Sequence, residues 1–415
     1  MVRKGSGYFS LDATEVSAQT RRVFEGETEL LVPSAEEPAK FPSFFNNQGK
    51  FVRDVSIVCY KAFASTATSV DGAVRKDLIF ADSLAGTGVR GIRVANEVPQ
   101  FSKVCINDIS PTSLALARSS AEVNKVSEKC IFSKEEVCSF LSSRNQISGE
   151  RFDVVDVDPF GSPSPFVDCA LRAVKHGGLL SVTATDTAVL CGVYPKVALR
   201  KYLGVPIRTD YSHEVGVRLI FGLLSMTAMR FECSIEPIFC HHDRHYFRAY
   251  CLVRVGNRYS LENERNIGFV KHCFKCGQRS ILPQSSVFAL SVRGCLPDSG
   301  KGQYDSSFAC EACGANMTRF AGPLWTGKIQ SLEFVKSCSG LSDLSIFKPE
   351  LDLPLYYDLA QMSDSLGIRT PKISEVFDKL TSGGRSASRT RLNRNALRTD
   401  CPALELQKIL KELAR

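Results

Sequence analysis

The chain of 415 residues is too long for one ordinary hydrophobic core, so we expect two or three domains. Its 52 lysines and arginines exceed its 44 aspartates and glutamates by eight, which allows a polyanionic partner without identifying one. No stretch approaches the roughly 18–20 apolar residues that span a bilayer, and residues 1–10 lack the apolar segment of a secretory signal peptide, so we expect no membrane anchor.

Residues 77–187 alternate short apolar runs with helical stretches, which is typical of a parallel α/β sheet. An amphipathic helix opening at Arg53-Asp54 precedes this region. The pattern predicts a doubly wound Rossmann-like sheet whose ligand crevice lies at the carboxyl ends of its strands. The expected strands are 77–83, 103–107, 130–133, 152–157 and 178–183, and the expected helices are 88–98, 113–123 and 168–174. His176-Gly177-Gly178 is interpreted as a helix stop followed by a turn.

A glycine turn follows the first expected strand. Gly86, Gly88 and Gly91 have the G-x-G-x-x-G spacing, which allows a tight turn and close approach of a ligand to the backbone. Asp108 lies about 20 residues downstream, after the second strand, where a carboxylate can accept both ribose hydroxyls of a nucleoside. The motif alone leaves a dinucleotide and S-adenosylmethionine open, and Glu135-Glu136 after the third strand could meet an adenine.

The fourth expected strand ends in Asp158-Pro159-Phe160-Gly161. An ordinary turn is the alternative, since Asp and Pro are turn residues. In the crevice of a nucleoside-binding sheet, however, this block suits chemistry on an amino group attached to a planar ring. The Asp158 carboxylate and the Pro159 carbonyl would accept its N–H bonds, and Phe160 would stack on a base that has left its helix. Asp158 is therefore interpreted as a positioning acceptor.

A strand pair is expected over 235–255, crossing Cys240-His241-His242-Asp243-Arg244-His245, which we interpret as a hairpin rather than a metal site. The composition then shifts to Gly, Ser, Cys and turn residues, which places a domain boundary near residue 265. The predicted domains are 1–265, with an N-terminal extension, and 266–415.

Two C-x-x-C pairs, each followed by glycine, stand out among the 16 cysteines. Cys273 with Cys276 and Cys310 with Cys313 each fit one half of a tetrahedral Zn²⁺ site, within a knuckle of about residues 272–320. A redox pair or buried thiols are the alternatives. Most other cysteines, such as Cys59, Cys105, Cys169 and Cys251, are interpreted as small buried thiols in a reducing compartment.

The C-terminal segment is basic: residues 372–398 carry seven lysines and arginines against two acids. A helix over 373–380, a Gly383-Gly384 turn and a Ser/Arg run predict a winged or helix-turn-helix-like unit. Arg385, Arg389, Arg391 and Arg394 would neutralise phosphates without reading sequence; a solvated charged face is the alternative.

At these residues the chain resembles the tRNA (guanine-26-N2)-dimethyltransferase family, over about residue 5 to the C-terminus. The matching stretches are 45–46, 52–56, 86–93, 107–108, 156–163, 185–186, 213–214, 386–390 and 399–400. The resemblance implies S-adenosylmethionine as the methyl donor, held by Arg53, Arg90, Asp108 and the Glu136-Val137 backbone region, with Asp158 catalytic.

It also implies that one guanine of a tRNA is methylated once or twice at N2. A DNA or protein-glutamine amine methyltransferase is the rival enzyme, and a catalytically silent tRNA-binding protein is the rival of another class. We expect a cytoplasmic monomer, with the nucleus or mitochondrion as alternatives for a eukaryotic source.

Overall fold

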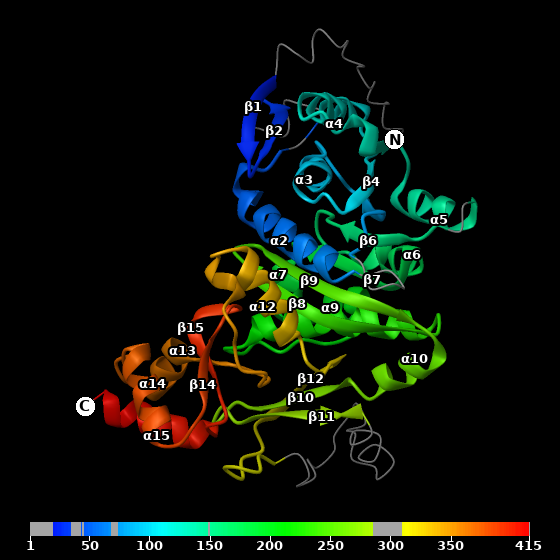
Figure 1. The fold of residues 1–415 in the computed structure, drawn as a ribbon. Coiled ribbons are helices and arrows are strands. Elements are labelled where there is room, and N and C mark those ends of the chain that lie inside the picture. Colours follow the sequence, from blue (N-terminus) through cyan, green and yellow to red (C-terminus); the bar gives the residue numbers. More distant parts are fainter. Residues whose placement is uncertain are drawn as a thin grey trace, which may run out of the picture. The chain divides into compact units, whose positions relative to one another are not determined.

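The computed structural model of the chain describes residues 20–34, 43, 45–67, 74–147, 150–284 and 309–414. They belong to two compact units (Figure 1). The first unit contains the residues up to Asp158 with 172–180 and 340–342, and the second contains 159–171, 181–339 and 343 onward. The expected N-terminal extension before residue 20 lies outside the described residues, and the functional division at residue 265 stays a prediction.

A seven-stranded sheet has the order β5-β4-β3-β6-β7-β9-β8. Its strands are β3 (Leu78–Asp82), β4 (Phe101–Asn107), β5 (Cys130–Ser133), β6 (Phe152–Val157), β7 (Val174–Ala184), β8 (Cys233–Asp243) and β9 (Tyr246–Val255). β3 pairs parallel with β4 and β6, and β4 pairs parallel with β5, whereas β8 and β9 form the expected antiparallel hairpin. The predicted fold class, a mostly parallel α/β sheet, is confirmed.

Helices cover both faces of the parallel strands in the first unit, as a sheet of this kind requires. Figure 1 shows α2 (Lys50–Thr66), α3 (Val89–Glu97) and α4 (Pro111–Val123) on one face and α5 (Val137–Ile147) on the other. Every residue of β3 is buried. Ser110 begins α4 by accepting the Ser113 N–H, and Pro111 occupies the first turn.

A short hairpin of β1 (Thr20–Glu25) and β2 (Thr28–Pro33) is anchored to the helices α3 and α4 of this unit. The Thr28 hydroxyl donates to Glu97 Oε1 at 2.8 Å, and the Leu31 N–H donates to Ser120 Oγ at 2.9 Å. The two helices therefore hold the hairpin's second strand at two points.

The expected turn at His176-Gly177-Gly178 is wrong, because these residues lie inside β7, which begins at Val174 directly after α6 (Val167–Ala173). Gly177 has φ +75°. A Cβ at Gly178 would lie 2.9 Å from the Asp153 carbonyl oxygen. The glycines therefore allow a close backbone approach within the sheet.

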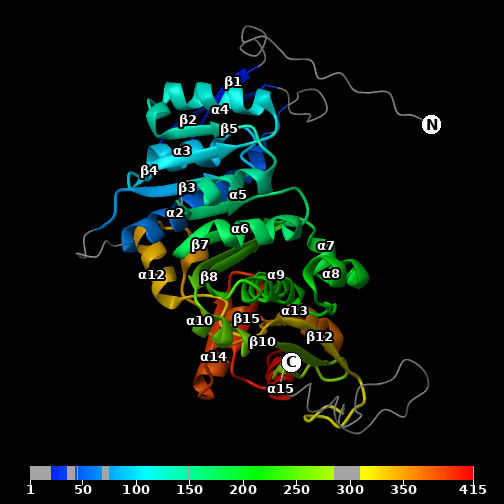
Figure 2. The same ribbon diagram turned by 90° about the vertical axis from the view of Figure 1, so that its right-hand side faces the viewer.

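The second unit adds two three-stranded sheets (Figure 2). The first has the order β11-β10-β12, from β10 (Ile267–Cys273), β11 (Arg279–Pro283) and β12 (Thr318–Trp325), and packs on the buried helix α9 (Ser212–Met229). Before its C-terminal part, the second unit also contains the helices α7 (Thr187–Leu190), α8 (Pro195–Tyr202) and α10 (Asn257–Glu264), and most of α12 (Leu332–Leu341).

The C-terminal part of the second unit has its own apolar core. Its elements follow in the order β13 (Tyr357–Asp358), α13 (Leu359–Leu366), α14 (Ile373–Ser382), β14 (Ala387–Thr390), β15 (Asn393–Thr399) and α15 (Ala403–Leu413). Val376, Leu397 and Leu406 are fully buried in it. Among the helices of the described residues, none combines the length and the apolarity needed to cross a membrane.

Candidate functional site

The glycine turn lies between β3 and α3, as predicted. Gly86 and Gly88 have φ +54° and +76°, in the region that side chains disfavour. A Cβ at Gly88 would lie 2.5 Å from Ala117 Cβ, so helix packing also requires glycine there. The Gly86 N–H donates to Asp108 Oδ2 at 2.8 Å, which joins the turn to the end of β4.

Asp108 is half-buried, and its second oxygen Oδ1 accepts the Ser110 N–H at 2.8 Å. Burial raises the pKa of this carboxyl above its ordinary value. The next side chain, Ile109, is 67% exposed. A fixed carboxylate beside an exposed apolar side chain suits a nucleoside, whose ribose hydroxyls donate and whose base has a flat aromatic face.

Asp82, the last residue of β3, is a buried acid for which the sequence predicted no role. Its Oδ2 accepts the Gly91 N–H at 2.9 Å, while Oδ1 is buried without a hydrogen-bond partner among the described residues. Burial raises its pKa to about 7. An unsatisfied carboxylate oxygen here fits a cationic or N–H-bearing ligand. The signal in the sequence is a single acid ending an otherwise apolar strand.

Arg53 lies on α2 with its guanidinium paired to a protein carboxylate. Its Nε and Nη2 donate to Glu25 Oε2 and Oε1 at 2.8 and 2.5 Å, and Nη2 also donates to the Asn46 carbonyl. The side chain is nearly buried and lies 5.1 Å from the Phe45 ring centroid. Arg53 thus forms a bidentate pair with the Glu25 carboxylate, although the resemblance implies that it helps to hold the cofactor.

Arg90 lies in the first turn of α3 and bridges two carboxylates at the end of β6. Nη1 lies 3.1 Å from Asp156 Oδ1, and Nη2 lies 2.7 Å from Asp158 Oδ2. The other Asp156 oxygen accepts the Tyr60 hydroxyl. Asp156 is fully buried, whereas the Asp158 side chain is 28% exposed. Arg90 therefore fixes one oxygen of an accessible carboxylate.

The residues after Asp158 form a loop that is fastened within the second unit. The Gly161 N–H donates to Thr185 Oγ1 at 2.7 Å, and the Thr185 N–H donates to the Gly161 carbonyl at 2.8 Å. Gly161 has φ +81° and open space where a Cβ would lie, so its backbone conformation is what favours glycine. Pro159 is buried and Phe160 is 81% exposed, which leaves that ring accessible for stacking.

Glu136 and Val137 lie at the start of α5. The Glu136 carboxylate accepts the Cys138 and Ser139 N–H groups at 2.8 and 3.0 Å, which makes it a helix cap. Glu135 is held through its backbone by Asn107, which accepts the Glu135 N–H at 3.0 Å and donates to its carbonyl at 3.0 Å. The end of β5 is thereby joined to the end of β4.

The four knuckle cysteines are brought together. Sγ atoms of Cys273 and Cys313 are 3.7 Å apart, those of Cys276 and Cys310 are 3.5 Å apart, and all four lie within 4.8 Å of one another. A tetrahedral site with Zn–S bonds of about 2.3 Å needs sulfurs roughly 3.8 Å apart. The donor set and spacing therefore fit one zinc ion.

The two knuckles repeat the same backbone geometry. The Gly277 N–H donates to the Cys273 carbonyl, and the Gly314 N–H donates to the Cys310 carbonyl, both at 2.8 Å. These glycines have φ +72° and +69°. Residues 285–308, between the two pairs, lie outside the described residues.

The predicted basic residues of the C-terminal part have different environments. Arg389 and Arg394 are exposed on the β14–β15 hairpin. Arg385 is paired with Glu405 at 2.5 Å. The Arg391 side chain is only 4% exposed, 3.4 Å from Glu350 and over the Phe239 ring at 4.8 Å.

The other cysteines mostly match their interpretation: Cys59, Cys105 and Cys251 are buried free thiols. The expectation of a free thiol at Cys169 is wrong, because this residue is disulfide-bonded.

Comparisons with known proteins cover nearly the whole chain. A family model described as N2,N2-dimethylguanosine tRNA methyltransferase matches residues 26–411. A tRNA (guanine(26)-N(2))-dimethyltransferase of Methanothermobacter thermautotrophicus is 34% identical over 406 residues, covering 94% of this chain and 98% of the relative. One of Pyrococcus abyssi is 32% identical over 403 residues, covering 92% and 96%.

Among solved structures, the complex of Trm1 from Pyrococcus horikoshii with S-adenosyl-L-methionine is similar throughout. Its TM-score is 0.77 at 27% sequence identity, covering 95% of this chain and 100% of that chain.

Proposed function

The chain belongs to the N2,N2-dimethylguanosine tRNA methyltransferase family, and we propose that it transfers one or two methyl groups from S-adenosylmethionine to N2 of a guanine in tRNA, at a position of the guanine-26 type. The observation that carries the proposal is the ion pair of Arg90 with Asp158, beside a glycine turn joined to Asp108. This ion pair supports a role for Asp158 as an accessible, fixed carboxylate in the proposed nucleoside crevice.

S-adenosylmethionine supplies an electrophilic methyl group on a sulfonium. The residues present fit it: Asp108 suits the ribose hydroxyls, Gly86 and Gly88 allow a close approach, and the unsatisfied Asp82 Oδ1 suits the ammonium group. The backbone at Glu136-Val137 would meet the adenine. Arg53 and Arg90 would bind the methionine carboxylate only by exchanging a carboxylate partner that each already has.

Asp158 would act on the guanine amine as an acceptor. Held by Arg90, its carboxylate accepts an N–H bond and directs the nitrogen lone pair toward the methyl group. The lone pair forms the new C–N bond as the S–C bond breaks, and the surplus proton leaves N2 afterwards. The Pro159 carbonyl would accept the other N–H, and the exposed Phe160 ring would stack on the extruded base.

A structural Zn²⁺ on Cys273, Cys276, Cys310 and Cys313 is part of the proposal, supported by the sulfur spacings. With four protein ligands it has no open position, so it would stabilise the fold rather than react.

The tRNA contact of residues 266–415 is proposed to involve the exposed Arg389 and Arg394. Arg385 would contribute a partly neutralised charge, and Arg391 would act by holding the hairpin through Glu350. Cytoplasmic location and a monomeric state stay predictions.

The test is incubation of the full chain with methyl-labelled S-adenosylmethionine and a tRNA transcript, followed by nucleoside mass spectrometry. N2-methylguanosine and N2,N2-dimethylguanosine are expected, and replacing guanine 26 by adenine should abolish both. Label in another base, or label that persists in the substituted transcript, would contradict the assignment.

A further inference from the structure

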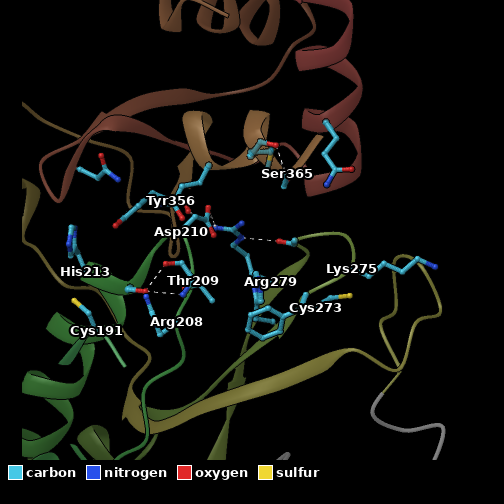
Figure 3. A pocket seen from close by; sticks show the side chains of 18 of the residues that line it. Cys191, Arg208, Thr209, Asp210, His213, Cys273, Lys275, Arg279, Tyr356 and Ser365 are labelled. Atoms are coloured by element: carbon cyan, nitrogen blue, oxygen red, sulfur yellow. Dashed lines mark hydrogen bonds and ion pairs between the residues drawn. The ribbon is translucent and has the colours of Figure 1, made fainter. Parts of the chain in front are cut away.

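A cavity of about 760 Å³ lies within the second unit, outside the methyl-transfer crevice. Its walls come from the segment 208–213 before and at the start of α9, the first cysteine knuckle, and α13 with its neighbours (Figure 3). This volume lies in the range of about 300–1,000 Å³ typical of small-molecule sites. No step of the proposed methyl transfer uses it.

The walls are held in place by Arg279, which is buried at the start of β11. Its Nη1 lies 2.9 Å from Asp210 Oδ2 and donates to the Tyr356 carbonyl at 2.6 Å. Its guanidinium lies over the rings of Tyr211 and Tyr357, 4.4 and 4.0 Å from their centroids. Asp210 neutralises this charge, so Arg279 fixes the cavity rather than attracting an anion.

Two other cations line the cavity without such a partner. Arg208 and Lys275 are both exposed, and neither forms an ion pair in the described part of the chain. Figure 3 shows Arg208 and His213 on one side of Arg279 and Lys275 on the other. The cavity therefore carries a net positive charge at its accessible side.

Three buried polar atoms of the lining, Thr209 Oγ1, Tyr356 OH and His272 Nδ1, lack hydrogen-bond partners among the described residues. Tyr356 OH and His272 Nδ1 belong to side chains that are 1% and 6% exposed. Buried polar groups normally form hydrogen bonds, so the missing partners of these two atoms indicate a ligand that supplies them.

The knuckle tip adds an aromatic surface beside these charges. Phe274 is 43% exposed, and the exposed Arg319 guanidinium lies 5.5 Å from its ring centroid. An exposed ring flanked by cations stacks on an unpaired base while the cations meet phosphates.

We propose that this cavity binds a second, unstacked nucleotide of the tRNA, distinct from the methylated guanine. Arg208 and Lys275 contact its phosphates, Phe274 stacks on a base, and Tyr356 OH with His272 Nδ1 bonds polar atoms of the bound nucleotide. The inference rests on the proposed function, since it takes tRNA as the substrate. By binding this nucleotide, the second unit would hold the tRNA and position it for methyl transfer.

The test compares full-length variants in tRNA binding at several salt concentrations. In Arg208→Ala/Lys275→Ala, the slope of log affinity against log salt should fall by about one for each phosphate that is no longer neutralised. Arg258→Ala/Lys336→Ala removes two exposed charges of the same unit outside the cavity and should leave the slope unchanged. Equal slopes in both double variants, while the wild type methylates tRNA, would overturn the cavity proposal alone.

Two further readouts identify the ligand. Ultraviolet cross-linking of the tRNA complex should attach a nucleotide to the peptides containing Phe274 or Tyr356, and Tyr356→Phe should raise the KM for tRNA with little change in kcat. Absence of both effects would contradict the proposal. A free nucleoside 5′-monophosphate that binds the wild type, fails to bind Arg208→Ala/Lys275→Ala and does not compete with tRNA would assign the cavity to a free nucleotide instead.

Discussion

Glu214 and Arg398 form a buried ion pair across 184 positions of sequence: Arg398 Nη1 lies 2.7 Å from Glu214 Oε2. Arg398 also lies 3.2 Å from Glu350 and donates to the Leu353 carbonyl. Glu214 in turn is 2.8 Å from Arg218 within α9. The pair thus fastens the C-terminal strand β15 to the central helix of the second unit.

Removing one partner should be costly, because it leaves the other charge buried without compensation. We expect Arg398→Ala to lower the free energy of unfolding by about 3–5 kcal/mol, measured by denaturant titration. The exposed pair Arg254 with Glu236 is a matched control, and Arg254→Ala there should cost at most about 1 kcal/mol. Equal losses in the two variants would contradict a special role for the buried pair.

The same pair predicts an acid dependence of stability. Burial alone would raise the pKa of Glu214, but Arg398 and Arg218 outweigh it and lower that pKa from 4.5 to about 2. A depressed folded pKa means that the stabilisation is complete above about pH 4.5 and is lost as the pH falls toward 2. Unfolding monitored between pH 6 and pH 2.5 should show this loss, and Glu214→Gln should lack that component. An acid unfolding profile in Glu214→Gln that is identical to that of the wild type would rule out this contribution of Glu214.

Asp82 predicts a pH dependence of opposite sign. Its folded pKa of about 7 lies above the ordinary 3.8, so burial of the ionised form costs stability as the pH rises from about 4 to about 7. A ligand ammonium would favour the ionised form. Affinity for S-adenosylmethionine, measured calorimetrically without tRNA, should therefore rise with pH over this interval.

Asp82→Asn should remove that rise and weaken binding. Asp77 lies directly before the same strand with its side chain 74% exposed, so Asp77→Asn is the control for removal of one carboxylate. A pH profile that is unchanged in Asp82→Asn would show that this acid does not meet the cofactor.

The zinc proposal predicts one metal ion per chain. Cys276→Ser should reduce the content found by elemental analysis, and a strong chelator should expose the remaining thiols and lower stability. Cys338→Ser, a buried free thiol outside the cluster, should keep its metal. An unchanged one-to-one content in Cys276→Ser would exclude the site.

Much of the parallel sheet is predictable from short β-branched runs: β5 and β6 begin and end where expected, at 130–133 and 152–157. Every residue of β6 is buried, as expected for a strand covered on both faces, whereas the edge strand β5 is only partly buried. The glycines at 177–178 are ambiguous in the sequence, since a turn and a close approach between strands demand the same residue. Only the Asp153 carbonyl beside Gly178 distinguishes the two.

The candidate site is predictable where its residues follow strand ends, as Asp108 and Asp158 do. Contacts between residues distant in sequence are not predictable in this way. Arg53 contacts Glu25 and Arg90 contacts Asp156, 28 and 66 positions away, and no local sequence pattern indicates either contact. A count of charges in the sequence also groups Arg391 and Arg398 with the surface cations. In the structure both side chains are buried, and they form ion pairs with Glu350 and Glu214.

The decisive measurement is methyl transfer by Asp158→Ala, quantified by nucleoside mass spectrometry alongside tRNA affinity. We predict a fall in kcat of about 10²- to 10³-fold, with tRNA binding retained and Asp158→Asn partly active as an acceptor through its amide oxygen. Methylation at the wild-type rate in Asp158→Ala would contradict the role assigned to this carboxylate.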